Sequence, residues 1–160
     1  MLLPSLITLI LPAAATSLIL PRQHVRPNAC CFTLHEAANG QIVRQQTGSG
    51  FLYLGGSRPT GWYCIDLALP EILYDAFNNA CFLNPDEVFQ CFDPTRSDDD
   101  WGIKQSGDDV LIFVNGSSRF KVCPTESGDL IYSNLKKDAR CRGLTLKAMG
   151  LKGSCGSLRG

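Results

Sequence analysis

The chain has 160 residues, 44% of them hydrophobic, and its 15 basic and 15 acidic residues give a formal net charge of zero. Once an N-terminal leader is subtracted, this length is typical of one domain. The balanced charge gives no support for nucleic-acid binding. Eight cysteines follow the leader, and no two form a C-x-x-C pair. An even number of scattered cysteines is typical of oxidising compartments, so we expect a secreted, disulfide-bonded protein.

An apolar leader opens the sequence. Residues 2–11 are largely apolar, and Ala13 and Ala15 form the A-x-A pattern that signal peptidase recognises. Residues 1–15 are therefore predicted to be a signal peptide. The run is too short to span the roughly 30 Å hydrocarbon core of a membrane. A buried N-terminal strand or helix is the alternative.

Arg22 is a candidate processing site between the leader and the domain. A trypsin-like enzyme of the secretory pathway could cleave after it, so residues 16–29 are interpreted as a propeptide and a disordered start. Residues 30–155 then form one domain, and residues 156–160 form a tail. N-terminal sequencing of the secreted protein tests this division.

Apolar residues alternate with a period of two along much of the domain, which is typical of β-strands. Asn39-Gly40 predicts a hairpin turn. The expected strands, in chain order, are residues 32–34, 41–43, 51–54, 110–114, 120–123, 130–132 and 144–146. Residues 71–77 follow Pro70 and are predicted to form a short helix. The fold class is therefore all-β: an antiparallel β-sandwich or barrel with one short helix, stapled by disulfides.

The sequence offers little catalytic chemistry. His35 is the one histidine inside the predicted domain, and a single histidine beside a strand is more typical of a surface residue than of a general base. No nucleophile elbow, HExxH or phosphate-loop motif is present. A glycosidase needs a pair of carboxylates, and the candidates are Asp66, Glu71, Asp75, Glu87 and Asp93. Any acidic secreted domain offers such pairs, so they are weak evidence for this activity. We expect no enzyme activity, with a glycoside hydrolase as the weaker alternative.

No cofactor and no metal site are expected. The lack of close cysteine pairs, together with only two histidines, disfavours zinc. The run Asp98-Asp99-Asp100 offers hard oxygens to calcium, but its spacing fits no recognised calcium loop. A solvated acidic turn is the favoured interpretation.

Charge is unevenly distributed along the chain. Acidic residues concentrate between residues 86 and 109, and basic residues between 136 and 159. Two solvated faces explain this pattern. The more specific alternative is that the basic residues form a patch that binds an acidic polymer such as phosphomannan, or a membrane surface.

Two surface features point to glycans. Planar side chains can stack on sugar rings, and the aromatic candidates are Trp62, Tyr63, Trp101 and Tyr132. Of these, Trp62 follows the loop-like stretch 58–61 and is the candidate glycan contact. Asn115-Gly116-Ser117 is an N-glycosylation acceptor at a predicted turn.

The chain also carries a recognisable series of motifs. In order they are Cys30-Cys31-Phe32, Phe89-Gln90-Cys91-Phe92, Trp101-Gly102-Ile103, Leu111-Ile112, Ser118-Arg119-Phe120-Lys121-Val122-Cys123, Leu130-Ile131-Tyr132, Cys141, Leu144-Thr145-Leu146 and Cys155. Over residues 30–155 this series resembles the C-terminal domain of fungal Pir-type cell-wall mannoproteins and related small cysteine-rich secreted fungal proteins. The match rests on cysteines and strand spacing, and it includes no catalytic signature. Trp101 matches the tryptophan of this family, so the resemblance implies that it packs in the core.

Two attachment devices of fungal wall proteins are not found. Pir proteins carry N-terminal repeats whose glutamine forms an ester with β-1,3-glucan, and this sequence has no such repeat. Residues 150–160 are polar and glycine-rich, unlike a glycolipid-anchor signal. We therefore expect a protein that is soluble or held to the wall by disulfides or noncovalent contacts.

The resemblance implies part of the disulfide pairing. The Pir-type domain has four cysteines, which correspond to one of Cys30 and Cys31, and to Cys123, Cys141 and Cys155; this implies the pairs Cys123–Cys141 and Cys30–Cys155. Neighbouring strand residues point to opposite faces, so Cys30 and Cys31 need different partners. For the remaining four, Cys31–Cys64 and Cys81–Cys91 is the economical assignment among many connectivities.

The expected function is a secreted, non-catalytic, monomeric fungal protein that associates with the cell wall or binds its glycans. Its partner would be a wall polysaccharide or a mannoprotein, with no nucleic acid and no membrane span. The alternative is a secreted effector that acts on a host-plant protein or on competing microbes.

Overall fold

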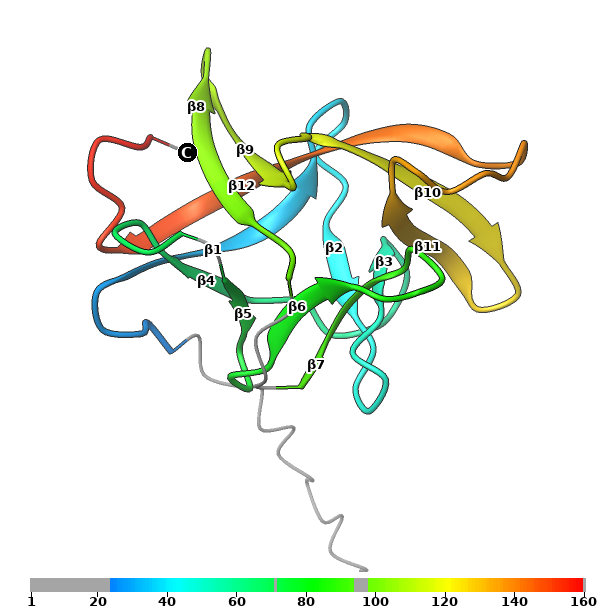
Figure 1. The fold of residues 1–160 in the computed structure, drawn as a ribbon, viewed down its shortest axis with the longest axis horizontal. Helices are drawn as coiled ribbons and strands as arrows, with labels where there is room; N and C mark the ends of the chain where they lie inside the picture. Colours follow the sequence, from blue (N-terminus) through cyan, green and yellow to red (C-terminus); the bar gives the residue numbers. More distant parts are fainter. Residues whose placement is uncertain (1–23, 71, 94–97, 160) are drawn as a thin grey trace, which may run out of the picture.

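Twelve β-strands make up the structure, a computed structural model that describes residues 24–70, 72–93 and 98–159 (Figure 1). The predicted signal peptide and the Arg22 processing site lie outside these residues. The strands are β1 (Ala29–Glu36), β2 (Val43–Gln45), β3 (Leu52–Leu54), β4 (Tyr63–Asp66), β5 (Leu73–Asp75), β6 (Ala80–Leu83), β7 (Phe89–Asp93), β8 (Trp101–Ser106), β9 (Asp109–Val114), β10 (Arg119–Thr125), β11 (Gly128–Ser133) and β12 (Arg142–Gly153). All ladders are antiparallel, and the sheet curls into a half-barrel, which confirms the all-β prediction.

A similar strand pairing recurs in three groups of four strands along the chain, and it is complete in the first and the third. Within each group of four strands the middle two form a hairpin: β2 with β3, β6 with β7, and β10 with β11. The outer strands pair as β1 with β4 and β9 with β12, and the groups join through β4 with β5, β8 with β9, and β12 with β1. This is the strand connectivity of a β-trefoil, except that no ladder joins β5 to β8 among the described residues.

β9 illustrates why these residues form strands. Its residues alternate strictly, with Val110, Ile112 and Val114 buried and the residues between them partly exposed. Gly107 before the strand and Asn115 after it both have positive φ, at 60° and 50°. Glycine adopts this conformation without steric cost and asparagine tolerates it better than most residues, so a tight turn forms at each end.

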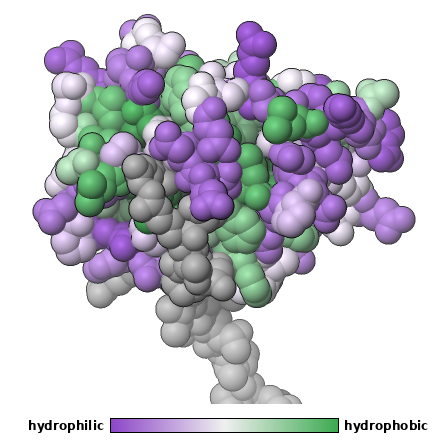
Figure 2. Space-filling view, in the orientation of Figure 1, coloured by the Kyte–Doolittle hydropathy of each residue, from purple (hydrophilic) through white to green (hydrophobic). Residues whose placement is uncertain are grey.

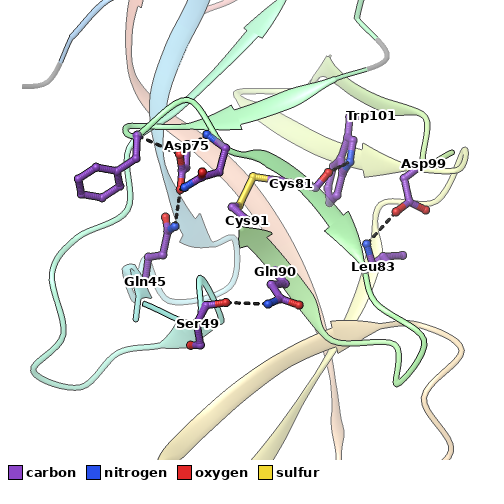
Figure 3. The surroundings of a disulfide bond; sticks show 11 residues. Gln45, Ser49, Asp75, Cys81, Leu83, Gln90, Cys91, Asp99 and Trp101 are labelled. Carbon is purple, nitrogen blue, oxygen red and sulfur yellow. Dashed lines mark hydrogen bonds between the residues drawn. A yellow bond between two sulfur atoms is a disulfide. The ribbon is translucent and has the colours of Figure 1, made fainter. Parts of the chain in front are cut away.

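The core lies between the curled strands and is centred on aromatic rings. The ring centroids of Phe89 and Trp101 are 4.7 Å apart, and those of Phe89 and Phe120 are 5.9 Å apart. The buried Trp101 indole N–H donates to the carbonyl of Cys81 at 2.9 Å, so its one polar group is satisfied (Figure 3). Trp101 is therefore a core residue, as the motif series led us to expect.

Four disulfides tie the strands together. The pairs are Cys30–Cys155, Cys31–Cys64, Cys81–Cys91 and Cys123–Cys141, the same four that the sequence analysis assigns. Cys30 belongs to the main core, whereas Cys31 packs in a small cluster with Ala29, Trp62 and Cys64 on the other face of β1. The alternation of side chains along β1 thus sends the adjacent cysteines to different partners.

The helix predicted for residues 71–77 is wrong, because this stretch contains strand β5, and no helix occurs among the described residues. Glu71 lies outside the described residues. The Asp75 carboxylate accepts hydrogen bonds from the backbone N–H groups of Phe77 and Asn79, each at 2.9 Å. This local turn competes with helix formation, and the edge of β4 supplies a ladder for Leu73 and Tyr74.

Candidate functional site

The strongest candidate site is an open groove with a volume of about 800 Å³ beside β12. β9 and β10 follow each other in the chain and pair with successive parts of the same strand: Leu111 of β9 lies opposite Lys147, and Arg119 of β10 lies opposite Thr145. Residues of both strands and of β12 line the groove, together with residues 36–38 at the end of β1. We call it the β12 groove.

Both polar and apolar residues line the β12 groove. It comprises Glu36, Ala37, Ala38, Ser106, Asp109, Leu111, Arg119, Phe120, Lys121, Asn134, Gly143, Leu144 and Thr145. On the face that Figure 2 shows, hydrophilic residues cover most of the side that carries β10 and β11. Four charged groups, two hydroxyls and one amide therefore meet in a solvent-open channel whose walls are backbone ladders.

Each of the two carboxylates in the groove is paired with a cation. Glu36 accepts from both terminal nitrogens of Arg142, at 2.5 and 3.0 Å, and its side chain is only 5% exposed. These hydrogen bonds are the main reason that the pKa of Glu36 is lowered, although burial opposes the shift. Asp109 accepts from the ammonium of Lys147 at 2.9 Å.

The two cations in the groove differ in what they contact. Lys121 donates to the backbone carbonyl of Lys136 at 2.5 Å and faces no carboxylate. The side chain of Arg119 makes no hydrogen bond or ion pair within the described part of the chain, and the residue is exposed. A residual positive charge therefore lines the groove.

The structure overturns the expectation that Trp62 is exposed. The residue is 5% exposed, packs beside the Cys31–Cys64 disulfide, and donates its indole N–H to the carbonyl of His24 at 3.0 Å. His24 therefore contacts it, and Val25 packs against the same cluster. Trp62 therefore offers no open ring face for sugar stacking, and Tyr63 and Tyr132 are buried too.

Asn115 lies in the exposed turn between β9 and β10, as its sequon predicts. Its amide nitrogen donates to the Asp99 carboxylate at 2.8 Å, and its amide oxygen accepts from the backbone N–H of Asp100 at 2.8 Å. The side chain thus ties the turn to the segment before β8. Occupancy by a glycan stays a prediction.

The candidate catalytic residues that the structure describes make local hydrogen bonds. His35 lies between the Thr33 hydroxyl, at 2.9 Å, and the Gly40 carbonyl, at 3.0 Å. The buried Asp75 carboxylate accepts from Gln45 at 2.7 Å and from Asn79 (Figure 3). Asp66 accepts from the backbone of its own turn, and Glu87 accepts from the Ser133 hydroxyl. Glu71 and the Asp93 side chain lie outside the described residues.

The acidic run 98–100 also has a structural role. Asp99 accepts from the backbone N–H of Leu83 at 2.7 Å as well as from Asn115, so its carboxylate joins β6 to the β9–β10 turn (Figure 3). Across residues 24–70, 72–93 and 98–159, no group of three or more His, Cys, Asp or Glu side chains is arranged to hold a metal ion.

Sequence reasoning did not locate the β12 groove. A local signal exists in β10, where the charged Arg119 and Lys121 alternate with the buried Phe120 and Val122. This alternation places both cations on one face of the strand. It does not reveal that a groove lies beside them, because the groove depends on the pairing of β9 and β10 with the distant strand β12.

In comparisons with known proteins, no family model and no curated protein sequence matches the chain. The resemblance to the Pir-type domain therefore rests on the motifs described above. Among the described residues, no helix has the length and apolarity needed to cross a membrane.

Proposed function

We propose that the chain is a secreted, non-catalytic fungal protein that binds a cell-wall polysaccharide in the β12 groove. The observation that carries the proposal is the groove itself, an open channel of about 800 Å³ in which hydroxyl, amide and charged groups lie among apolar residues. A polysaccharide presents hydroxyl groups along an extended chain, and a solvent-open channel admits such a chain without requiring its ends to enter.

The scaffold around the groove supports a binding role. The floor and one wall are β12 and β10, which pair over Arg119–Val122, and β10 is tied by the Cys123–Cys141 disulfide to the segment before β12. The Glu36–Arg142 ion pair holds the end of β1 at the same place. A site built on strands that are fixed in this way loses little conformational entropy when a ligand binds.

The test is retention of the purified, oxidised protein on insoluble β-1,3-glucan, chitin and mannan. Gly143→Phe is the informative variant, since a Cβ added at Gly143 meets no atom within 4 Å and the new ring fills the groove. Gly102→Phe is the matched control, because Gly102 has equally open space on β8 but does not line the groove. We expect retention on at least one polymer, lost in Gly143→Phe and kept in Gly102→Phe.

Two outcomes contradict the proposal. If the unaltered protein is retained on none of the polymers, wall-glycan binding fails, and a secreted effector with a protein partner becomes the better hypothesis. If Gly143→Phe binds as well as Gly102→Phe, the protein binds glycan at another surface. Thermal unfolding of both variants shows whether each retains the native fold.

A further inference from the structure

We propose that the β12 groove selects polysaccharides that carry an anionic group, a phosphate ester or a carboxylate, and that Arg119 binds this group. The inference rests on the proposed function and deepens it by naming the ligand chemistry. It follows from the way in which the charges of the groove are paired.

The charges that line the groove do not cancel. The two carboxylates, Glu36 and Asp109, are held by Arg142 and Lys147. Neither Arg119 nor Lys121 faces a carboxylate among the described residues. Two lining cations thus remain without an anionic partner, while both lining anions are neutralised. An anionic ligand completes this arrangement, whereas a cationic one would have to displace an existing ion pair.

The two cations are also placed to act together. They are two residues apart on β10, so they project from the same face about 7 Å apart along the strand. Thr145 lies opposite Arg119, and Gly143 lies opposite Lys121. Gly143 has no side chain to fill the groove beside β10, and Thr145, which also lines it, offers a hydroxyl that can accept or donate to a ligand.

Arg119 is better suited than Lys121 to be the principal contact. Its planar guanidinium can donate two parallel hydrogen bonds to a carboxylate or a phosphate, and none of its donors is used by the described residues. Lys121 already donates to the carbonyl of Lys136, so it acts as a second, weaker contact. Charge-assisted hydrogen bonds of this kind are stronger than hydrogen bonds to neutral hydroxyl groups.

The experiment measures affinity for soluble polymers that differ in charge. The probes are a phosphorylated mannan, a polygalacturonate and an unphosphorylated mannan, each titrated at low and at high sodium chloride. Arg119→Gln removes the proposed contact. Arg140→Gln is the control of equal charge change, because Arg140 is exposed, pairs with Asp138 and does not line the groove.

We expect the unaltered protein to bind one anionic polymer more tightly than the neutral mannan, with affinity that falls as salt rises. Arg119→Gln should weaken that binding about tenfold, as expected for a lost charge-assisted hydrogen bond, and leave any binding to neutral mannan unchanged. Arg140→Gln should have little effect. Preference for the phosphorylated mannan or for the polygalacturonate identifies the anionic group.

The failures of the two proposals are distinguishable. Equal affinity for neutral and anionic polymers, with binding still lost in Gly143→Phe, overturns the anionic preference and leaves the groove as a neutral-glycan site. Equal weakening by Arg119→Gln and Arg140→Gln shows diffuse attraction by net charge and also overturns it. Binding to none of the soluble or insoluble polymers overturns both proposals.

Discussion

Glu36 and Arg142 are 106 residues apart in the chain, yet their side chains form two hydrogen bonds that join the end of β1 to the start of β12. The Glu36 carboxylate is nearly buried, whereas the Arg142 side chain is 51% exposed. The pair therefore keeps a buried charge satisfied at the wall of the β12 groove, and one consequence is a pH dependence of stability.

The folded protein lowers the pKa of Glu36 below its ordinary 4.5, so folding favours the ionised carboxylate. The stability that Glu36 contributes is present above about pH 4.5 and is lost as pH falls through the lowered folded pKa. We expect Glu36→Gln to be less stable than the unaltered protein at pH 7 and to lose less further stability between pH 5 and pH 3. Urea midpoints measured across this range test the expectation.

Asp138 is the control for that experiment, because Arg140 lowers its pKa to about 2 by hydrogen bonding. The Asp138–Arg140 pair is on the surface, where solvent weakens such pairs. Asp138→Asn should therefore change the loss of stability between pH 5 and pH 3 much less than Glu36→Gln does. Equal effects of the two substitutions would mean that the Glu36–Arg142 pair has no special role.

The disulfides should differ in their contributions to stability. Cys30–Cys155 closes a loop with a sequence separation of 125, whereas Cys81–Cys91 closes one with a separation of 10. Loop-closure entropy gives about 5 kcal/mol for the first and about 3 kcal/mol for the second. Cys30, Cys81 and Cys91 are buried but Cys155 is only partly buried, so loss of packing does not by itself make the Cys30–Cys155 variant the less stable one.

Urea unfolding of the two double variants measures this difference. We expect the variant that lacks Cys30–Cys155 to be the less stable of the two by about 2 kcal/mol. A Cys81–Cys91 deletion that costs as much or more would show that local packing around the β6–β7 hairpin outweighs chain entropy.

Much of the fold could be predicted from the sequence because its signals are local. The alternation in β9 and the turn at Asn115 predict that strand and its end. The adjacent Cys30 and Cys31 require partners on opposite faces of β1, which is how the structure uses them. By contrast, the apolar spacing of residues 71–77 suits a helix, and β5 forms because Asp75 stabilises a turn and β4 offers an edge.

The threefold pairing and the groove could not be predicted, since both depend on contacts between distant strands. The three groups of four strands span residues 29–66, 73–106 and 109–153, which differ in length and show no repeated sequence. Trp62 follows a loop, but its environment is decided by His24 and Val25, which precede β1 and contact its cluster.

Substitution of Trp62 separates the buried role from the glycan-contact role. Trp62→Ala leaves a cavity beside the Cys31–Cys64 disulfide and should destabilise the protein by about 3 to 5 kcal/mol. Trp62→Phe keeps a ring but loses the hydrogen bond to His24, so about 1 kcal/mol of that loss is expected for the bond. Both variants, where folded, should bind polymers as the unaltered protein does. Loss of binding without loss of stability would show that the ring is accessible.

The Asn115 sequon predicts a single N-linked glycan on protein secreted by a fungal host. Ser117→Ala removes the sequon and keeps Asn115, whose hydrogen bonds to Asp99 and Asp100 hold the β9–β10 turn. Ser117→Thr is the control that preserves the sequon. We expect glycosidase digestion to lower the apparent mass of the unaltered protein and of Ser117→Thr, but not of Ser117→Ala. An unchanged mass in all three would show that Asn115 is not glycosylated, and that a sequon in an exposed turn is not sufficient for modification.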